Sequence, residues 1–324
     1  MLFLGCDSGS TKMAFALCDT QGRVLAARSF PGITLFRNRG SEYAALLTGY
    51  AHALLADAGI AASAITMGAL GLTGYGESAE AEPVMREAVS AAFPGMPMIL
   101  VNDAVVGWSG ALQARPGIHV VAGTGAIAYG EDGKGGKARC GGWSTFCDDE
   151  GSAYWIAREG LNLFYRQADR RIPKTALYDR WMQALQITDP LHAPGAFDAL
   201  TGGWQPARVA AFQRLMLTLC QEGDPCAEQV YAQAADHLFH LVSTLAHTLC
   251  FAEKSIPVSY SGGVFRGKGL PLDRFSAHCA QAGLHLCAPA FGPLAGSIGY
   301  AARDSVDASV LSHMMECVDK TPVV

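Results

Sequence analysis

The sequence has few charged residues and no excess of basic ones. Only 16% of its 324 residues are charged, and 24 Lys and Arg stand against 29 Asp and Glu, a net charge of −5. A nucleic-acid-binding protein usually carries a basic surface, so this balance argues against such a partner. Half of the residues are hydrophobic, which argues against disorder and supplies a large core. The length predicts two lobes.

Long apolar runs, a leader segment and closely paired cysteines are also missing. No stretch reaches 18 uninterrupted apolar residues, so we expect neither a membrane span nor a membrane partner. The first residues, up to Asp7, lack the basic region of a signal peptide. The ten cysteines form no Cys-x-x-Cys pair, and Cys6, Cys18, Cys250 and Cys287 lie in or next to apolar runs. The sequence therefore predicts a cytoplasmic protein with buried, reduced thiols.

The first third of the chain predicts a mixed sheet. Short turns separate three apolar runs, which indicates an antiparallel meander. Helical spacing and buried strands then alternate, which indicates parallel strands joined by helical crossovers. The expected strands are 1–6, 13–18, 23–30, 65–72 and 98–101, and the expected helices are 41–58, 80–92 and 104–113.

The opening pattern recurs after residue 115. A strand, a Gly-Thr-Gly turn and a second strand follow one another, and Thr124 precedes Gly135 by the same distance as Thr11 precedes Gly22. This match indicates a duplicated fold. The remaining expected strands are 118–122, 126–130, 257–260 and 284–287, and the expected helices are 151–168, 226–253 and a final one at about 293–312.

A glycine-containing turn between the first two strands is the first candidate site. Backbone N–H groups, small hydroxyls and an ammonium group there suit a phosphate, and the residues are Gly9, Ser10, Thr11 and Lys12. Asp7 could hold Mg²⁺, which favours one or two carboxylates together with substrate phosphates. The spacing of a Walker loop is absent. The alternative is an ordinary glycine hairpin.

Two later turns could complete a nucleotide site. The turn of Gly123, Thr124 and Gly125 matches the first hairpin, and two such hairpins facing across a cleft could clamp the triphosphate of ATP. Gly262 and Gly263 follow a strand, where a backbone without side chains could approach a nucleoside closely. The alternative for this last turn is a simple connection from strand to helix.

Asp103 ends a buried strand just before a helix begins. A carboxylate in this position can accept the proton of a substrate hydroxyl while that hydroxyl attacks phosphorus. Aspartate also favours the N-cap of a helix, which is the alternative interpretation.

A loop around Trp143 has the composition of a sugar site. Glycines flank the tryptophan, whose apolar face suits a sugar ring, and Asp149 and Glu150 supply hydrogen-bond acceptors. The alternative is a glycine loop whose acids cap the next helix, as Glu150 is placed to do.

The resemblance of the chain to a known family rests most specifically on residues 140–157. They read Cys-Gly-Gly-Trp-x(5)-Asp-Glu-Gly-Ser-Ala-Tyr-Trp-Ile-Ala and resemble the sugar-site segment of N-acetylglucosamine kinases. The wider group includes glucosamine kinases and the BadF/BadG-type ATPases, within the actin-like sugar-kinase superfamily. The resemblance implies an α/β fold of two actin-like, ribonuclease H-like lobes, each with a mixed sheet, around a central cleft. The expected lobes are 1–114, on which the final helix could pack, and a helix-rich 115–292.

The resemblance also implies roles for individual residues. Asp103 would be the catalytic base, and it would deprotonate the 6-hydroxyl of N-acetylglucosamine or glucosamine. Thr11 and Thr124 would contact the phosphates of ATP, with Mg²⁺ at Asp7. The sugar would lie on Gly142, Trp143, Ser144 and Asp149, and the adenosine on Gly262 and Gly263 with Ser297 close by.

Three positions depart from the family pattern and leave the identity of the sugar open. Asn38 is the nearest match to an asparagine that the family often places after the third strand. Ala126 and Ile127 replace Ser-Asn after the second hairpin, and Asp148 replaces a glycine. A homodimer with a small-molecule amino sugar as substrate is expected. Two other functions stay open, an ATPase that activates a partner enzyme and a sugar sensor without catalysis.

Overall fold

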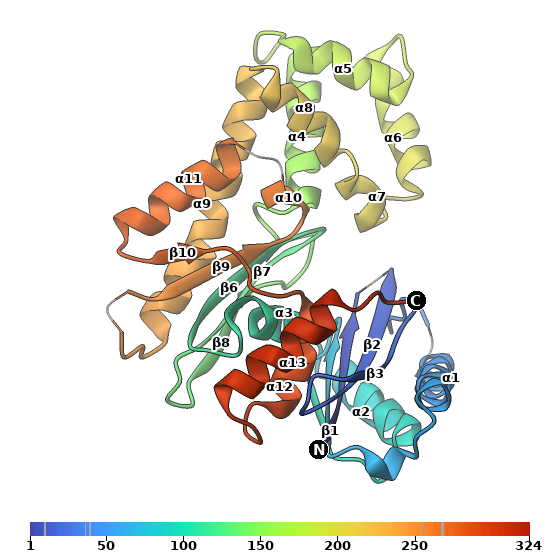
Figure 1. Cartoon of the computed structure of the whole chain (residues 1–324). Coiled ribbons are helices and arrows are strands. Elements are labelled where there is room, and N and C mark those ends of the chain that lie inside the picture. Colours follow the sequence, from blue (N-terminus) through green and yellow to red (C-terminus); the bar gives the residue numbers. More distant parts are fainter. Residues whose placement is uncertain (10, 36, 39, 254, 267–268) are drawn as a thin grey trace. The chain divides into compact units, whose positions relative to one another are not determined.

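The structure is a computed structural model that describes all residues except 10, 36, 39, 254 and 267–268. The chain forms two compact units (Figure 1). Unit 1 comprises Met1–His119 and Ala288–Val324, and unit 2 comprises Val120–Cys287. The end of the chain therefore belongs to the first unit, and both junctions lie a few residues from those expected from the sequence.

Unit 1 contains a five-stranded mixed sheet in the order β3-β2-β1-β4-β5. β1 (Leu2–Ser8), β2 (Lys12–Asp19) and β3 (Val24–Pro31) form the predicted antiparallel meander. β4 (Met67–Leu72) and β5 (Met98–Asn102) are parallel to β1, as the alternation of strands and helices indicated. Because successive side chains of a strand point to opposite faces, each face of this sheet has its own helical cover.

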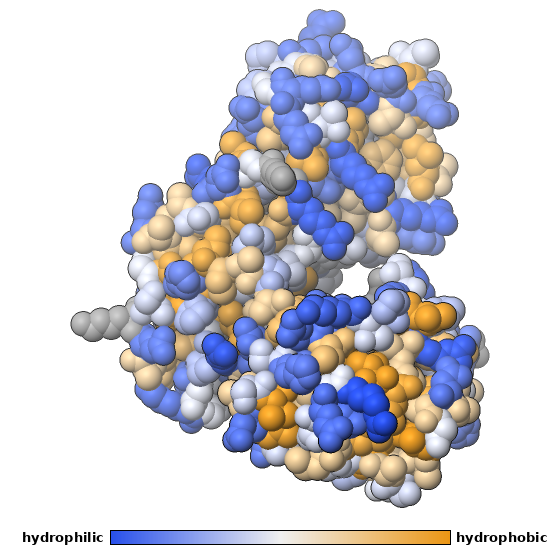
Figure 2. Space-filling view, in the orientation of Figure 1, coloured by the Kyte–Doolittle hydropathy of each residue, from blue (hydrophilic) through white to orange (hydrophobic). Residues whose placement is uncertain are grey.

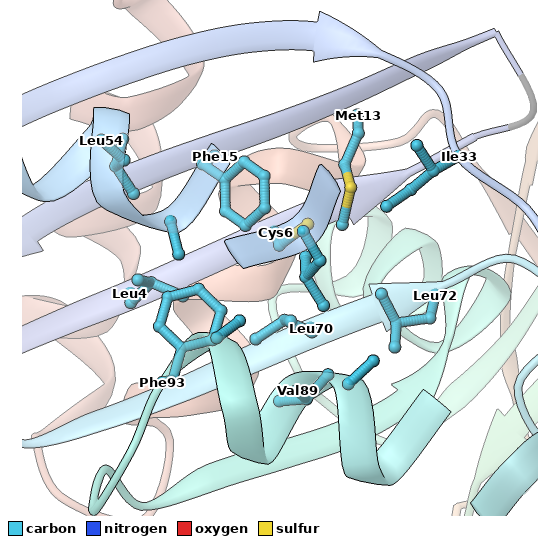
Figure 3. Close-up of a cluster of buried hydrophobic side chains, with 14 of the residues drawn as sticks. Leu4, Cys6, Met13, Phe15, Ile33, Leu54, Leu70, Leu72, Val89 and Phe93 are labelled. Carbon is cyan, nitrogen blue, oxygen red and sulfur yellow. The ribbon is translucent and has the colours of Figure 1, made fainter. Parts of the chain in front are cut away.

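One face of this sheet packs on α1 (Gly40–Ala58) and α2 (Ala81–Ala92), as Figure 3 shows. Leucine, phenylalanine and valine side chains from both helices and the sheet interdigitate there without exposure to water. Labelled members of this core are Leu4, Cys6, Met13, Phe15, Ile33, Leu54, Leu70, Leu72, Val89 and Phe93. Burial of this apolar surface is the main stabilising contribution of the face.

The other face of the sheet packs on the C-terminal helix α12 (Pro293–Ala302), which also contacts α3 (Asp103–Leu112) and α13 (Ala308–Lys320). The packing is close enough to require glycine. A Cβ atom on Gly5 would lie 2.3 Å from Ser297 Oγ, and one on Gly296 would lie 2.0 Å from the carbonyl oxygen of Val106. These glycines allow the helix backbone to approach β1 and α3 directly.

Gly296→Ala is therefore expected to destabilise the protein by at least about 1–3 kcal/mol, because the added methyl group meets backbone atoms that cannot move aside. Thermal unfolding measures the change. Gly49→Ala in α1 is the matched control, since nothing lies within 4 Å of its added methyl group. Equal melting temperatures for the two variants would contradict the close packing of α12.

Unit 2 has a second mixed sheet in the order β10-β9-β6-β7-β8. Its strands are β6 (Gly117–Ala122), β7 (Ala126–Glu131), β8 (Lys137–Gly141), β9 (Pro257–Ser261) and β10 (His285–Cys287). β7 and β8 are antiparallel, whereas β10 and β9 are parallel. β6 begins at Gly117, three residues before the first residue of unit 2, Val120.

Helices make up most of the rest of unit 2. They are α4 (Ala153–Ala168), α5 (Ala176–Leu185), α6 (Ala193–Thr201), α7 (Pro206–Ala210), α8 (Gln213–Gln221), α9 (Pro225–Thr248), α10 (Gly263–Arg266) and α11 (Leu270–Gln281). α9 packs on β7 and β8. The helices beyond α4 enclose aromatic side chains, of which Trp181 and Phe212 stack at 5.3 Å. Two predicted helices match α4 and α9, although α9 ends before residue 253.

All ten cysteines are free thiols. Cys6 and Cys18 are buried as predicted, and Cys287 is half-buried. The prediction is wrong for Cys250, which is exposed because α9 has already ended and the chain turns along the surface. Its backbone N–H donates to Asp132 Oδ2 at 3.2 Å.

The surface of the described residues mixes polar and apolar side chains. On the face shown in Figure 2, orange and blue residues alternate over much of each unit. No helix within the described ranges is both long and apolar enough to span a membrane. The expected homodimer stays a prediction.

Candidate functional site

Strand register brings Asp7, Thr73 and Asp103 to one edge of the sheet in unit 1. Ser8 pairs with Leu72, and Leu72 pairs with Asn102, so these residues form one row across three parallel strands. The next residues along β4 and β5 are Thr73 and Asp103. Asp7 lies one residue before the row on β1. Carboxyl ends of parallel strands meet at a common edge, which is where α/β proteins bind ligands.

The turn between β1 and β2 lies at the same edge. The N–H of Gly9 donates to the carbonyl of Lys12 at 2.8 Å and closes the hairpin. Thr11 and Lys12 are exposed, so their hydroxyl and ammonium groups can reach a phosphate. Ser10 lies outside the described residues. Unit 1 therefore places the predicted phosphate hairpin next to two carboxyl groups.

Both carboxyl groups have a raised pKa. Burial raises the pKa of Asp7 from 3.8 to about 7, repulsion from Asp103 adds to the effect, and Lys12 partly offsets it. Burial also raises the pKa of Asp103 to about 6; the hydrogen bond from Thr73 acts in the opposite direction, and repulsion from Glu77 raises it further. Perturbed carboxyl groups of this kind are typical of catalytic and metal-binding sites.

Asn102, and not Asp103, is the N-cap of α3. Its Oδ1 accepts a hydrogen bond from the N–H of Ala104 at 3.0 Å, and its amide donates to Tyr75 O at 3.1 Å and to Glu77 Oε1 at 2.7 Å. The alternative interpretation of Asp103 as the cap is therefore wrong. Asp103 is half-buried at the first residue of the helix, where its carboxylate can meet a substrate.

In unit 2, the start of α4 holds the second hairpin. The N–H groups of Ala153 and Tyr154 donate to Gly123 O at 2.9 Å and to Thr124 O at 3.3 Å. The N–H of Gly123 donates to Gly125 O at 2.9 Å and closes the turn. These bonds leave the Thr124 side chain exposed, as a phosphate contact would require.

Asp149 braces this hairpin. Its side chain is only 6% exposed, and its Oδ1 accepts a hydrogen bond from the N–H of Ala126 at 2.8 Å. A Cβ atom on Gly125 would lie 2.8 Å from both carboxylate oxygens, so Gly125 has to be glycine. The cap of α4 is Ser152, whose Oγ accepts from the N–H of Trp155 at 3.1 Å, and not Glu150. The structure therefore gives Asp149 a supporting contact, and the sugar contact stays a prediction.

The turn after β9 packs against the same hairpin. A Cβ atom on Gly262 would lie 2.2 Å from the carbonyl oxygen of Ala122, the residue just before Gly123. The φ angle of Gly262 is +104°, which an L side chain rarely adopts. Gly263 is exposed. Unit 2 thus brings the predicted adenosine turn and the second phosphate hairpin together.

The tryptophan loop presents an aromatic surface to solvent. Trp143 is 69% exposed, and its ring lies 4.3 Å from the guanidinium carbon of Arg139, in cation–π contact. The N–H of Trp143 donates to Asp148 Oδ2 at 2.8 Å, so the acid that replaces the family's glycine fixes the loop. Gly142 has a φ of +72° and is half-buried, and Ser144 Oγ accepts from Phe146 N at 3.1 Å. The loop is thus fixed with the tryptophan ring exposed to solvent, and its sugar contact stays a prediction.

The structure contradicts the predicted nucleotide contact of Ser297. This residue is fully buried in α12, and its hydroxyl donates to the carbonyl of Leu294 at 2.6 Å. It packs against Gly5 of β1 inside unit 1. The helical spacing of the sequence could not show which sheet the last helices cover.

Two residues near the site were missed at the level of the sequence. Thr73 contacts Asp103, and Arg139 supports Trp143. The signal for Thr73 was its place directly after the buried strand β4, in the same way that Asp103 directly follows β5. Arg139 gave no such signal, because only the turn after β8 brings the Trp143 ring next to it.

The sequence matches the BadF/BadG/BcrA/BcrD ATPase family over residues 4–273. The chain belongs to this family.

Two curated relatives are kinases by name. An N-acetylmuramic acid/N-acetylglucosamine kinase of Clostridium acetobutylicum is 29% identical over 55% of this chain and 58% of its own length, which is less than two thirds. An N-acetyl-D-glucosamine kinase of Dictyostelium discoideum is 27% identical over 85% of this chain and 89% of its own. A solved structure from Chromobacterium violaceum, assigned as an N-acetylglucosamine kinase, matches with a TM-score of 0.73 and 24% identity, covering 92% of this chain and 97% of its own. These matches confirm the predicted family and the two-lobe α/β fold.

Proposed function

We propose that this chain transfers the γ-phosphoryl group of ATP to the 6-hydroxyl of N-acetylglucosamine or glucosamine. The observation that carries the proposal is the group of Asp7, Thr73 and Asp103 at the carboxyl ends of β1, β4 and β5, beside the phosphate hairpin of unit 1. At the coarser level of enzyme class, family membership and the named kinases among its relatives support an ATP-dependent sugar kinase.

Asp103 is the proposed base. Its carboxylate accepts the proton of the sugar hydroxyl as that oxygen forms a bond to the γ-phosphorus, and the bond from this phosphorus to the β–γ bridging oxygen breaks to release ADP. A pKa of about 6 leaves the group ionised at neutral pH and still able to hold a proton briefly. Exclusion of water from the reacting groups would protect ATP from hydrolysis.

The carboxyl groups of unit 1 fit the magnesium ion that ATP brings. Asp7 is repelled by Asp103, and a divalent cation would relieve that repulsion. No group of three or more His, Cys, Asp or Glu side chains gathers as a metal site in the described part of the chain. Mg²⁺ needs no such cage when phosphates supply its other ligands. Held through Asp7, it would neutralise charge on the phosphates.

The nucleotide and the sugar would use the turns described above. We assign phosphate contacts to Thr11, Lys12 and Thr124, and the adenosine to the turn at Gly262 and Gly263. The sugar would pack on Trp143, with Gly142 and Ser144 beside it. The exposure of Thr11, Thr124 and Trp143 supports these roles, because ligand-binding groups must be reachable.

ADP release with a panel of acceptors tests the proposed function. The panel contains glucosamine, N-acetylglucosamine, N-acetylmuramic acid, N-acetylmannosamine, glucose and a sample without sugar. We expect an amino sugar to raise ADP release well above the sugar-free rate. Equal rates in every sample would contradict a kinase and favour an ATPase that activates a partner; tight sugar binding without any ADP would favour a sensor.

A further inference from the structure

Thr73 joins the proposed base to the phosphate hairpin. It follows β4, the strand that lies between β1 and β5 in the sheet of unit 1. Its Oγ1 lies 2.9 Å from Asp103 Oδ2 and is also hydrogen-bonded to the carbonyl oxygen of Ser8. The Ser8 carbonyl and the Gly9 N–H belong to one peptide group, and that N–H closes the hairpin onto Lys12.

We propose that Thr73 is a positioning residue for phosphoryl transfer, whose hydroxyl holds the Asp103 carboxylate in its accepting orientation and ties it to the peptide that begins the phosphate hairpin. The inference rests on the proposed function, since it concerns the base of that reaction. It adds a residue that was not among the predicted site residues and that no comparison names.

The hydroxyl of Thr73 has one hydrogen and two acceptor neighbours, so it donates to one of them at a time. While Asp103 is ionised, the hydrogen points to Oδ2, and Oδ1 is left to accept the proton of the sugar hydroxyl. After that transfer the proton is on Oδ1, and Oδ2, now the carbonyl oxygen of the acid, still accepts the hydrogen bond from Thr73. The carboxyl group therefore keeps Thr73 as its donor before and after the transfer, which holds Oδ1 toward the sugar hydroxyl.

The charges around Asp103 explain why a neutral donor stands here. Two acids repel this pair of sites: Asp103 and Asp7 on β1 repel each other, and Glu77 after β4 repels Asp103. The ammonium group of Lys12 on β2 attracts Asp7. Backbone N–H groups at the start of α3 lower the pKa of Asp103. A threonine adds a hydrogen bond to the carboxylate without adding a charge that would compete for the cation or the phosphates.

Replacing the hydroxyl tests the proposal. Thr73→Val keeps the shape of the side chain, and we expect it to lower kcat by about 10- to 100-fold, the scale of a lost hydrogen bond to a charged group. The KM values for sugar and ATP should stay near those of wild type, because Thr73 acts on the base and not on substrate binding. Thr73→Ser, which keeps the hydroxyl, should restore most of the activity. Thr48→Val is the matched control, since it removes a hydroxyl that donates to the carbonyl of Ala44 within α1.

Each outcome decides the proposal. Wild-type kcat in Thr73→Val, or a Thr73→Ser variant as impaired as Thr73→Val, would overturn it while leaving the proposed function intact. A wild-type enzyme without sugar-dependent ADP release would overturn the proposed function and this inference with it. Melting curves show whether Thr73→Val is folded; if it is not, Thr73→Ala removes the same hydroxyl without adding a methyl group and is judged by the same outcomes.

Discussion

Asp103→Asn is expected to lower kcat by at least about 100-fold, the usual scale for the loss of a general base. The amide has the same shape as the carboxylate but cannot take the proton of the sugar hydroxyl. The affinity for ATP should survive, because Asp103 faces the acceptor and the hairpin residues Thr11 and Lys12 are unchanged. Initial rates of ADP formation and calorimetric titration with ATP separate the two effects. Turnover close to wild type would remove Asp103 from the mechanism.

The pH dependence of the wild type gives a second view of Asp103. Its pKa is raised to about 6, and only the ionised form can act as a base. The rate should therefore be high above pH 7 and fall as the pH decreases through about 6. A flat rate between pH 5 and 7 would show that another group, or none, accepts the proton.

Asp7→Asn is expected to have opposite effects on activity and stability. Loss of the carboxylate removes the proposed magnesium contact, so we expect a large loss of kcat and a higher requirement for Mg²⁺. The folded protein should become more stable at pH 8. There the wild type holds an ionised Asp7 next to Asp103 in a buried site, which the asparagine relieves.

The sign of this stability change follows from the pKa of Asp7. Folding raises that pKa from 3.8 to about 7, so the carboxyl group favours the folded state fully below pH 3.8, and this contribution is lost as the pH rises through about 7. At ~1.4 kcal/mol per pKa unit, the gain from Asp7→Asn at pH 8 is up to ~4 kcal/mol, and it should shrink markedly by pH 5.

Thermal melts at pH 5 and pH 8 without nucleotide measure the effect. Asp304→Asn serves as the control, because Asp304 is 92% exposed and should change the melting temperature little at either pH. A melting temperature of Asp7→Asn that equals or falls below that of wild type at pH 8 would contradict the described environment of Asp7.

The sequence predicted the strands and acids of unit 1 because they follow local rules. Apolar runs of four to eight residues that end in polar turns are typical of buried strands, and β1, β2 and β5 lie where such runs predicted them. Asp7 and Asp103 could be found for the same reason, since each stands where a strand ends. Their mutual repulsion could not, because it depends on the register of β1, β4 and β5.

Tertiary contacts decided the remaining residues. Ser297 reads as a helix residue after a glycine turn, and only the packing of α12 on Gly5 shows that it is fully buried. The sequence did not show that the Asp149 carboxylate also accepts a hydrogen bond from the N–H of Ala126, and its predicted sugar contact stays a prediction. Thr73 lies 30 residues from Asp103 in sequence, so no local pattern links them.

The central claim is that a sugar hydroxyl accepts the γ-phosphoryl group of ATP. Phosphorus NMR of a reaction with N-acetylglucosamine or glucosamine tests it most directly. The account predicts a new sugar 6-phosphate resonance that grows in equal amount with ADP and is missing in Asp103→Asn. Growth of ADP together with inorganic phosphate, and no sugar phosphate from either acceptor, would contradict it.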